Sequence, residues 1–238
     1  MRQVYRRLSA QAVGAALLAS VLPSAFAVVL SSGASTPLTG TTAALEPVLA
    51  GTVIRDVIRD WTISTPLGDI VGRVQDRVVR ETAGGTLDFT TRIFVDSVPT
   101  TPGGVTPPPF SGVEFADRSV YSNFTTDVNW RIDGLGNTAP TEAARTTDGS
   151  SVTFVFGGQR VTPTDLPFGS RFFHIRTNAT EFDELGWLNL GSNQGTGPNF
   201  TTWLHVFQPI AAIPEPGTWA MLLAGILGVV GVARRRLS

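Results

Sequence analysis

Three acidic residues stand close together before a tryptophan: Glu181, Asp183 and Glu184 precede Gly186 and Trp187. Paired carboxylates can hydrolyse a glycosidic bond when they lie about 5–9 Å apart across a cleft. Carboxylates in an oxygen-rich loop can also bind calcium. Acids so near in sequence more often form a solvated turn, however. We therefore treat Glu181 and Asp183 as candidate ligand-binding residues, and as the acids that a hydrolase would use.

Tryptophans offer a second kind of chemistry, because an exposed indole ring can stack on the apolar face of a sugar. Four of them lie between the two ends of the chain: Trp61, Trp130, Trp187 and Trp203. As a group they are expected to fill the core of the fold. Trp187 is the exception that we expect to be exposed, because Gly186 and the preceding acids place it at the entry to a strand. It joins the candidate ligand-binding residues.

The two histidines, His174 and His205, are each flanked by bulky apolar residues. Alternation along a strand would place both on the polar face, so we expect surface or rim histidines. A metal site would need them close in space together with a carboxylate. The chain also lacks cysteine, which excludes thiolate chemistry and disulfides. With neither a Gly-x-Ser-x-Gly motif nor a phosphate-binding glycine loop in view, we predict a protein that is not an enzyme and has no cofactor or metal.

The charge distribution argues against nucleic acid as a partner. The chain has no lysine, and six of its 18 basic residues lie in the two ends. Residues 28–213 contain 12 arginines against 18 acidic residues, a net charge of −6. A nucleic-acid-binding domain would need a basic stripe instead.

The elements that must position these residues are strands. Leu87, Phe89 and Ile93 alternate with polar residues, and this period of two marks a half-buried strand. Similar patterns predict strands at 53–63, 70–81, 87–95, 113–121, 124–132, 143–147, 152–156, 171–177, 185–190 and 201–207. An Asp148-Gly149 pair predicts a hairpin turn. About ten short strands separated by turn signals predict an all-β fold, an antiparallel β-sandwich with a jelly-roll-like outline.

The domain organisation follows from composition. Residues 28–44 are rich in Ser, Thr, Gly and Ala and are predicted to be a flexible leader. Residues 45–210 would form the sandwich ectodomain. The proline-rich stretch at 99–109 is expected to be a surface loop within it, because a central strand cannot hold so many prolines.

The N-terminus has the three parts of a secretory signal peptide. A basic segment at residues 1–7 precedes an apolar segment at 10–22, and Ala25 and Ala27 form a small-x-small cleavage site. We predict cleavage after Ala27, by signal peptidase. The apolar segment, about a dozen residues long, is short for a bilayer span, which needs about 20.

The C-terminus contains a second address. Pro214, Glu215 and Pro216 precede an uncharged apolar stretch at 219–233, which Arg234, Arg235 and Arg236 follow. As a helix this stretch would be about 22 Å long, short of a hydrocarbon core of about 30 Å. The arginines would stop it on the cytoplasmic side by the positive-inside rule.

This order of features resembles the PEP-CTERM sorting signal, over about residues 213–238. The resemblance implies recognition of Pro214, Glu215 and Pro216 by the membrane protease exosortase, with processing near that motif. It also implies a Gram-negative-type bacterium that makes extracellular polysaccharide, an inner-membrane intermediate, and a final place at the cell surface or in the matrix.

Three hypotheses about function remain open. The first is a structural or polysaccharide-binding matrix protein, with the inner membrane as a transient partner and extracellular polysaccharide as the ligand. The second is a secreted hydrolase of that polymer using Glu181 and Asp183. The third is a tail-anchored periplasmic domain.

Overall fold

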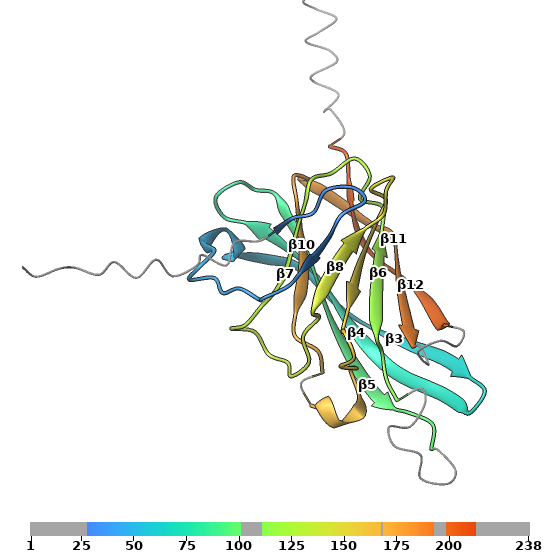
Figure 1. The fold of residues 1–238 in the computed structure, drawn as a ribbon. Coiled ribbons are helices and arrows are strands. Elements are labelled where there is room, and N and C mark those ends of the chain that lie inside the picture. Colours follow the sequence, from blue (N-terminus) through green and yellow to red (C-terminus); the bar gives the residue numbers. More distant parts are fainter. Residues whose placement is uncertain (1–27, 101–110, 168, 193–198, 213–238) are drawn as a thin grey trace, which may run out of the picture.

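The computed structural model describes residues 28–100, 111–167, 169–192 and 199–212. Within these ranges the regular elements are antiparallel strands in two layers, together with two short 3-10 helices (Figure 1). The elements are β1 (Val28–Val29), β2 (Ser35–Pro37), η1 (Pro47–Leu49), β3 (Gly51–Thr65), β4 (Gly68–Glu81), β5 (Leu87–Ser97), β6 (Phe115–Ser119), β7 (Thr126–Trp130), β8 (Glu142–Arg145), β9 (Ser151–Val155), η2 (Pro163–Asp165), β10 (Phe173–Thr177), β11 (Glu181–Ser192) and β12 (Phe200–Ile210).

The described strands form two six-stranded sheets, which confirms the predicted all-β sandwich. One sheet, here the long sheet, has the order β1-β7-β10-β5-β4-β3. The other, the short sheet, has the order β12-β11-β6-β9-β8-β2. Each of the ten predicted strands overlaps one of β3–β12, and the Asp148-Gly149 pair turns the chain between β8 and β9, with Gly149 at a φ of 71°.

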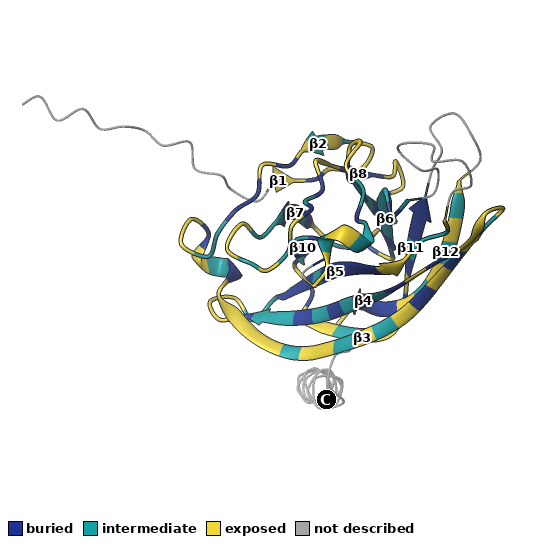
Figure 2. Cartoon of the chain, turned by 90° about the horizontal axis from the view of Figure 1, so that it is seen from below, coloured by how far each residue is buried: buried dark blue, intermediate teal, exposed yellow. Residues whose placement is uncertain are grey.

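Alternation along β5 selects the residues that face the core. Leu87, Phe89 and Ile93 point inward and are fully buried. This burial of large apolar side chains drives the two sheets together. In Figure 2 the edge strand β3 is mostly exposed or intermediate, whereas β5 and β10, in the middle of the same sheet, are largely buried.

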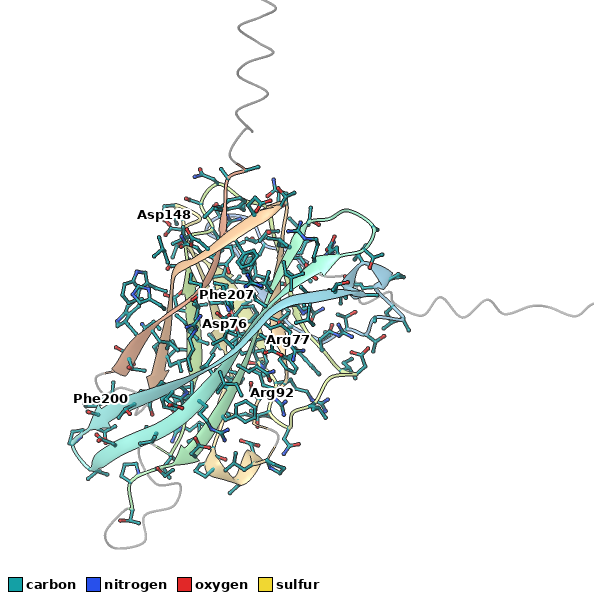
Figure 3. The ribbon with its side chains drawn as sticks, turned by 180° about the vertical axis from the view of Figure 1, so that it is seen from behind. Asp76, Arg77, Arg92, Asp148, Phe200 and Phe207 are labelled. Atoms are coloured by element: carbon teal, nitrogen blue, oxygen red, sulfur yellow. The ribbon has the colours of Figure 1, made fainter. Side chains whose placement is uncertain are left out.

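One ion pair crosses the core between the two sheets. Asp76 of β4 and Arg118 of β6 face each other with Oδ1 and Nη1 2.9 Å apart, and both side chains are buried. Asp76 also accepts a hydrogen bond from the Phe207 amide at 2.7 Å, and Arg118 donates to the Phe207 carbonyl and to the Thr91 hydroxyl. Asp76 and Phe207 lie next to each other in Figure 3. The pair therefore connects four strands from both layers, β4, β5, β6 and β12, to one another.

The segment 28–44 differs from the flexible leader that its composition predicts. It contributes β1 to the edge of the long sheet and β2 to the edge of the short sheet, and buries Leu30 and Leu38. Backbone hydrogen bonds order it, including Leu30 N to Thr126 O at 2.8 Å and Leu38 N to Thr141 O at 2.8 Å. A segment that is held mainly by backbone hydrogen bonds needs few apolar side chains, so its sequence shows little hydrophobic alternation from which a strand could be predicted.

Several predicted segments lie outside the described residues. They are the signal peptide at 1–27, most of the proline-rich loop at 99–109, and the sorting signal at 213–238 with its apolar stretch. In the part of the chain that the structure does describe, no helix has the length and apolar character needed to cross a membrane.

The buried pair generates a prediction about stability. Asp76→Asn leaves the Arg118 charge without its counterion in the core, so the free energy of unfolding should fall by about 3–5 kcal/mol. Urea denaturation of the purified protein measures the change.

The matched control is Asp96→Asn, because Asp96 also pairs with an arginine, Arg73, but at the surface. Exposed pairs contribute less than about 1 kcal/mol, so this variant should unfold close to the wild type. Equal losses for the two variants would contradict a special role for the buried pair.

Candidate functional site

The outward face of the short sheet brings aromatic and polar side chains together. Trp187 of β11 is paired with His205 of β12, and the next outward residue of β11, Asn189, is paired with Trp203. Asn189 is also paired with Asp117 of β6, on its other side. The period of two along each strand therefore places these five residues on one surface. We call this set the aromatic surface.

The rings of the aromatic surface contact one another while remaining exposed to solvent. Trp187 and Trp203 are 40% and 54% exposed. Their ring centroids lie 6.4 Å apart at an interplanar angle of 82°, an edge-to-face contact. The Trp187 ring also lies 3.9 Å from the His205 ring. Contacts between aromatic rings hold each ring in place. The result is a preformed platform rather than three independent side chains.

Two polar groups border the platform. The Asn189 Oδ1 atom is buried and has no hydrogen-bond partner among the described residues. Burial raises the pKa of the Asp117 carboxyl, while a hydrogen bond from Thr153, 3.1 Å long, acts in the opposite direction. A buried polar oxygen without a partner costs free energy. The Asp117 carboxyl, which is partly exposed, can accept a hydrogen bond from a ligand that rests on the rings.

The strand backbone fixes where the platform sits. The Ser119 hydroxyl lies 3.3 Å from the Trp187 amide and 3.4 Å from its carbonyl, and connects β6 to β11 at the level of Trp187. Farther along β11, Gly191 has no side chain, and the Phe115 ring occupies the space where a Cβ would be. The outward surface therefore continues from Trp187 toward Phe115 without a projecting side chain at Gly191.

The structure confirms that Trp187 is exposed, and it adds residues that sequence reasoning missed. Trp203 was expected in the core with the other tryptophans, but it is exposed. It lies two residues before His205, which was predicted on the polar face of the strand and is exposed there. Alternation along the strand could therefore have predicted that Trp203 is exposed. Asn189 and Asp117 carried no comparable signal, because only the pairing of β11 with β6 brings them together.

Glu181 and Asp183 lie at the other end of β11. A register shift between Asp183 and Gly186 separates them from Trp187. Glu181 is exposed, and the Asp183 carboxylate accepts a hydrogen bond from the Leu185 amide at 3.0 Å. Among the described residues, no three histidine, aspartate or glutamate side chains are grouped so as to hold a metal ion.

His174 corrects the prediction of a surface histidine. It is on the outward face of β10, as alternation requires, but it is only 1% exposed. Its strand lies in the middle of the long sheet, between β7 and β5. Burial, together with the charges of Arg131 and Arg176, lowers the pKa of His174 to about 3. The ring is therefore neutral at ordinary pH.

Comparison with known proteins identifies the C-terminal address. Residues 212–236 match the family model of the PEP-CTERM protein-sorting motif. The motif implies an exported protein that is processed by exosortase and directed through the membrane to the cell surface. No curated protein and no solved structure matches the chain.

Burial of neutral His174 generates a prediction about acid stability. The pKa of His174 is lower in the folded than in the unfolded state. The stability that depends on its neutral form is therefore complete above the unfolded pKa of 6.5 and is lost as the pH falls toward about 3. The wild type should lose up to about 1.4 kcal/mol of unfolding free energy per pH unit in this window from this group.

His174→Gln should remove that component of the slope, as measured by urea denaturation at a series of pH values. His205→Gln is the matched control, since His205 is exposed. An unchanged slope in His174→Gln would contradict the assignment.

Proposed function

We propose that this protein is a polysaccharide-binding component of the cell surface or extracellular matrix, and that the aromatic surface is its binding site. The observation that carries this proposal is the pair of exposed tryptophans in contact on a rigid sheet. Pyranose rings have apolar C–H faces and hydroxyl edges. Trp187 and Trp203 offer the surface for the faces, and the partly exposed Asp117 offers an acceptor for the hydroxyls.

The position of these groups on strands also favours binding. Side chains on strands of a packed sheet are held more firmly than side chains on loops. Less conformational entropy is then lost when a ligand orders them. A long polymer could lie across several strands, since the outward residues of β12, β11, β6 and β9 are in register.

The route to the surface follows from the two addresses. Signal peptidase would remove residues 1–27, with cleavage after Ala27. The apolar stretch at 219–233 would then hold the protein in the inner membrane, with Arg234, Arg235 and Arg236 on the cytoplasmic side. Exosortase would act near Pro214, Glu215 and Pro216, as the matching motif implies.

We propose binding rather than hydrolysis, and no nucleic-acid partner. The carboxylates that a hydrolase would use, Glu181 and Asp183, are on the far side of the β11 register shift from Trp187. The net charge of −6 over residues 28–213 opposes binding to phosphate backbones. Incubation of the protein with the producer's own exopolysaccharide tests the first point, since a hydrolase would release reducing ends.

Loss of the tryptophan rings tests the binding site. Trp187→Ala and Trp203→Ala should each weaken binding of the producer's exopolysaccharide by about tenfold or more, because a central aromatic anchor is removed. Tryptophan fluorescence titration of the purified protein measures binding, with affinity electrophoresis as an independent readout.

Ile58→Ala is the control, because Ile58 is 57% exposed but lies on β3 of the other sheet. Its affinity should equal that of the wild type. Unchanged affinity in both tryptophan variants, or no saturable binding by the wild type, would overturn the proposal.

Replacement of the sorting motif tests the route. A variant with Pro214→Ala, Glu215→Ala and Pro216→Ala should accumulate as a membrane-bound form that retains the C-terminal peptide, detectable by mass spectrometry of cell fractions. The wild type should lack that peptide in the surface fraction. An intact C-terminus in mature wild-type protein would support a tail-anchored domain instead.

A further inference from the structure

The outward face of the short sheet extends from the tryptophans across several strands. β12, β11 and β6 lie side by side in Figure 1, and β9 pairs with β6 on its far side. Backbone pairing aligns one outward residue from each of these four strands in a row: Trp203, Asn189, Asp117 and Thr153. Neighbouring strands lie about 4.8 Å apart, so the row is about 14 Å long. A ligand that follows the row is therefore longer than one sugar ring.

The side chains on both sides of this row leave the surface low between β11 and β9. On one side, the Phe115 ring of β6 lies over Gly191 of β11, in the space that a Cβ would occupy. On the other side, the outward residues of β6 and β9 are Ser119 and Ser151, which are paired with each other. An extended, ribbon-like chain can therefore lie across these strands, whereas a coiled chain would touch them at one point only.

The full charges on this face are negative. The outward residues of β6, β8 and β9, and of the paired segments 187–191 and 201–205, include two carboxylates, Asp117 and Glu142, and no arginine. The arginines of those described strands, Arg118 and Arg145, point inward and are only 1% and 8% exposed. A ligand on this face therefore meets carboxylates without a guanidinium beside them.

Asp117 discriminates between neutral and acidic ligands by its charge. Its carboxylate can accept a hydrogen bond from a sugar hydroxyl, and such charge-assisted bonds are stronger than neutral ones. A uronate or a sulfated sugar would instead bring a like charge next to it, which costs free energy. The Thr153 hydroxyl, which donates to Asp117 at 3.1 Å, helps to hold the carboxylate in place within the row. One side chain thus favours one class of polymer and opposes another.

We propose that the aromatic surface binds an electrically neutral glycan in an extended conformation, and that the chain lies across the strands. One sugar ring rests on Trp187 and Trp203, and the following units pass over Asp117 toward Thr153 of β9. This inference rests on the proposed polysaccharide function and adds the class of polymer: a neutral glycan rather than a uronate or a sulfated one.

Isothermal titration calorimetry on the purified full chain in non-ionic detergent tests the class of ligand. The probes are two β-1,4-linked neutral hexasaccharides, cellohexaose and mannohexaose, and their uronate counterparts, hexaglucuronate and hexamannuronate. Each pair has the same linkage and differs by a carboxylate on every ring. At least one neutral hexasaccharide should bind saturably, and its uronate counterpart should bind at least about tenfold more weakly, because of the like charges.

Chain length tests the part of the row beyond the tryptophans. With the neutral glycan that binds, affinity should rise from the disaccharide to the tetrasaccharide, since the longer chain reaches Asp117 and Thr153. Equal affinities for the disaccharide and the hexasaccharide would confine the ligand to the tryptophans and would contradict a chain that crosses the strands.

Variants of Asp117 test its part in the selection. Asp117→Ala should weaken binding of the neutral hexasaccharide by about tenfold, because a charged acceptor is lost. Asp117→Asn keeps an acceptor oxygen without the charge, so the uronate hexasaccharide should bind about threefold more tightly than to the wild type. The comparison of neutral and acidic chains on the wild type needs no variant, so the test stands even if Asp117→Ala fails to fold.

Asp69→Asn is the matched control for Asp117→Asn. Asp69 is exposed on β4 of the long sheet, and its replacement changes the net charge of the protein by the same amount. Its affinities for the neutral and the uronate chains should equal those of the wild type. An equal gain in uronate binding for the two variants would show a general effect of net charge and would contradict selection by Asp117.

Failure of this inference is distinguishable from failure of the proposed function. Uronate chains that bind as tightly as neutral ones would overturn the neutral class and leave polysaccharide binding in place. The same holds if the producer's exopolysaccharide binds through Trp187 while neither neutral hexasaccharide binds. If no glycan binds at all, both the inference and the proposed function are wrong.

Discussion

The pair formed by Asp76 and Arg118 is the constraint on which the arrangement of the two sheets depends. Apolar burial brings two sheets together but fixes their relative position only loosely, because it has no direction. A buried ion pair with hydrogen-bonded partners has one satisfactory geometry, and any slip of one layer leaves a charge unpaired in the core. Since Asp76 and Arg118 also bond the Phe207 backbone, the same geometry sets the position of β12. That strand carries Trp203 and His205.

The two outward faces of the sandwich have different chemistry. The short sheet presents aromatic rings with neutral or protonatable acceptors, which suits uncharged sugar units. The long sheet presents arginines beside aromatic rings, such as Arg73 over Phe94. The inward residues of the two sheets form one core, so neither face can move far relative to the other.

Alternation of residue types predicts most of this architecture but only part of the aromatic surface. It locates β3–β12, the inward side of β5, and the exposed side of Trp187. It fails where the outcome depends on contacts distant in sequence. Arg145, in the separate β8–β9 hairpin, helps to order residues 28–44. Its guanidinium donates a hydrogen bond, 3.1 Å long, to the Leu30 carbonyl. Alternation places His174 on the outward face, but says nothing of its burial there.

The last strand leaves very little chain between the sandwich and the sorting motif. β12 ends at Ile210, and Pro214 is four residues later. The apolar stretch at 219–233 begins nine residues after Ile210, and nine residues reach at most about 32 Å, whereas the 11 residues of β12 span about 36 Å. In the membrane-held precursor that we propose, this connection is no longer than the domain it holds, so the sandwich would stay near the bilayer. Cleavage at the motif would then do more than change the address of the protein. It would free the binding face to reach polymer that lies beyond the membrane surface.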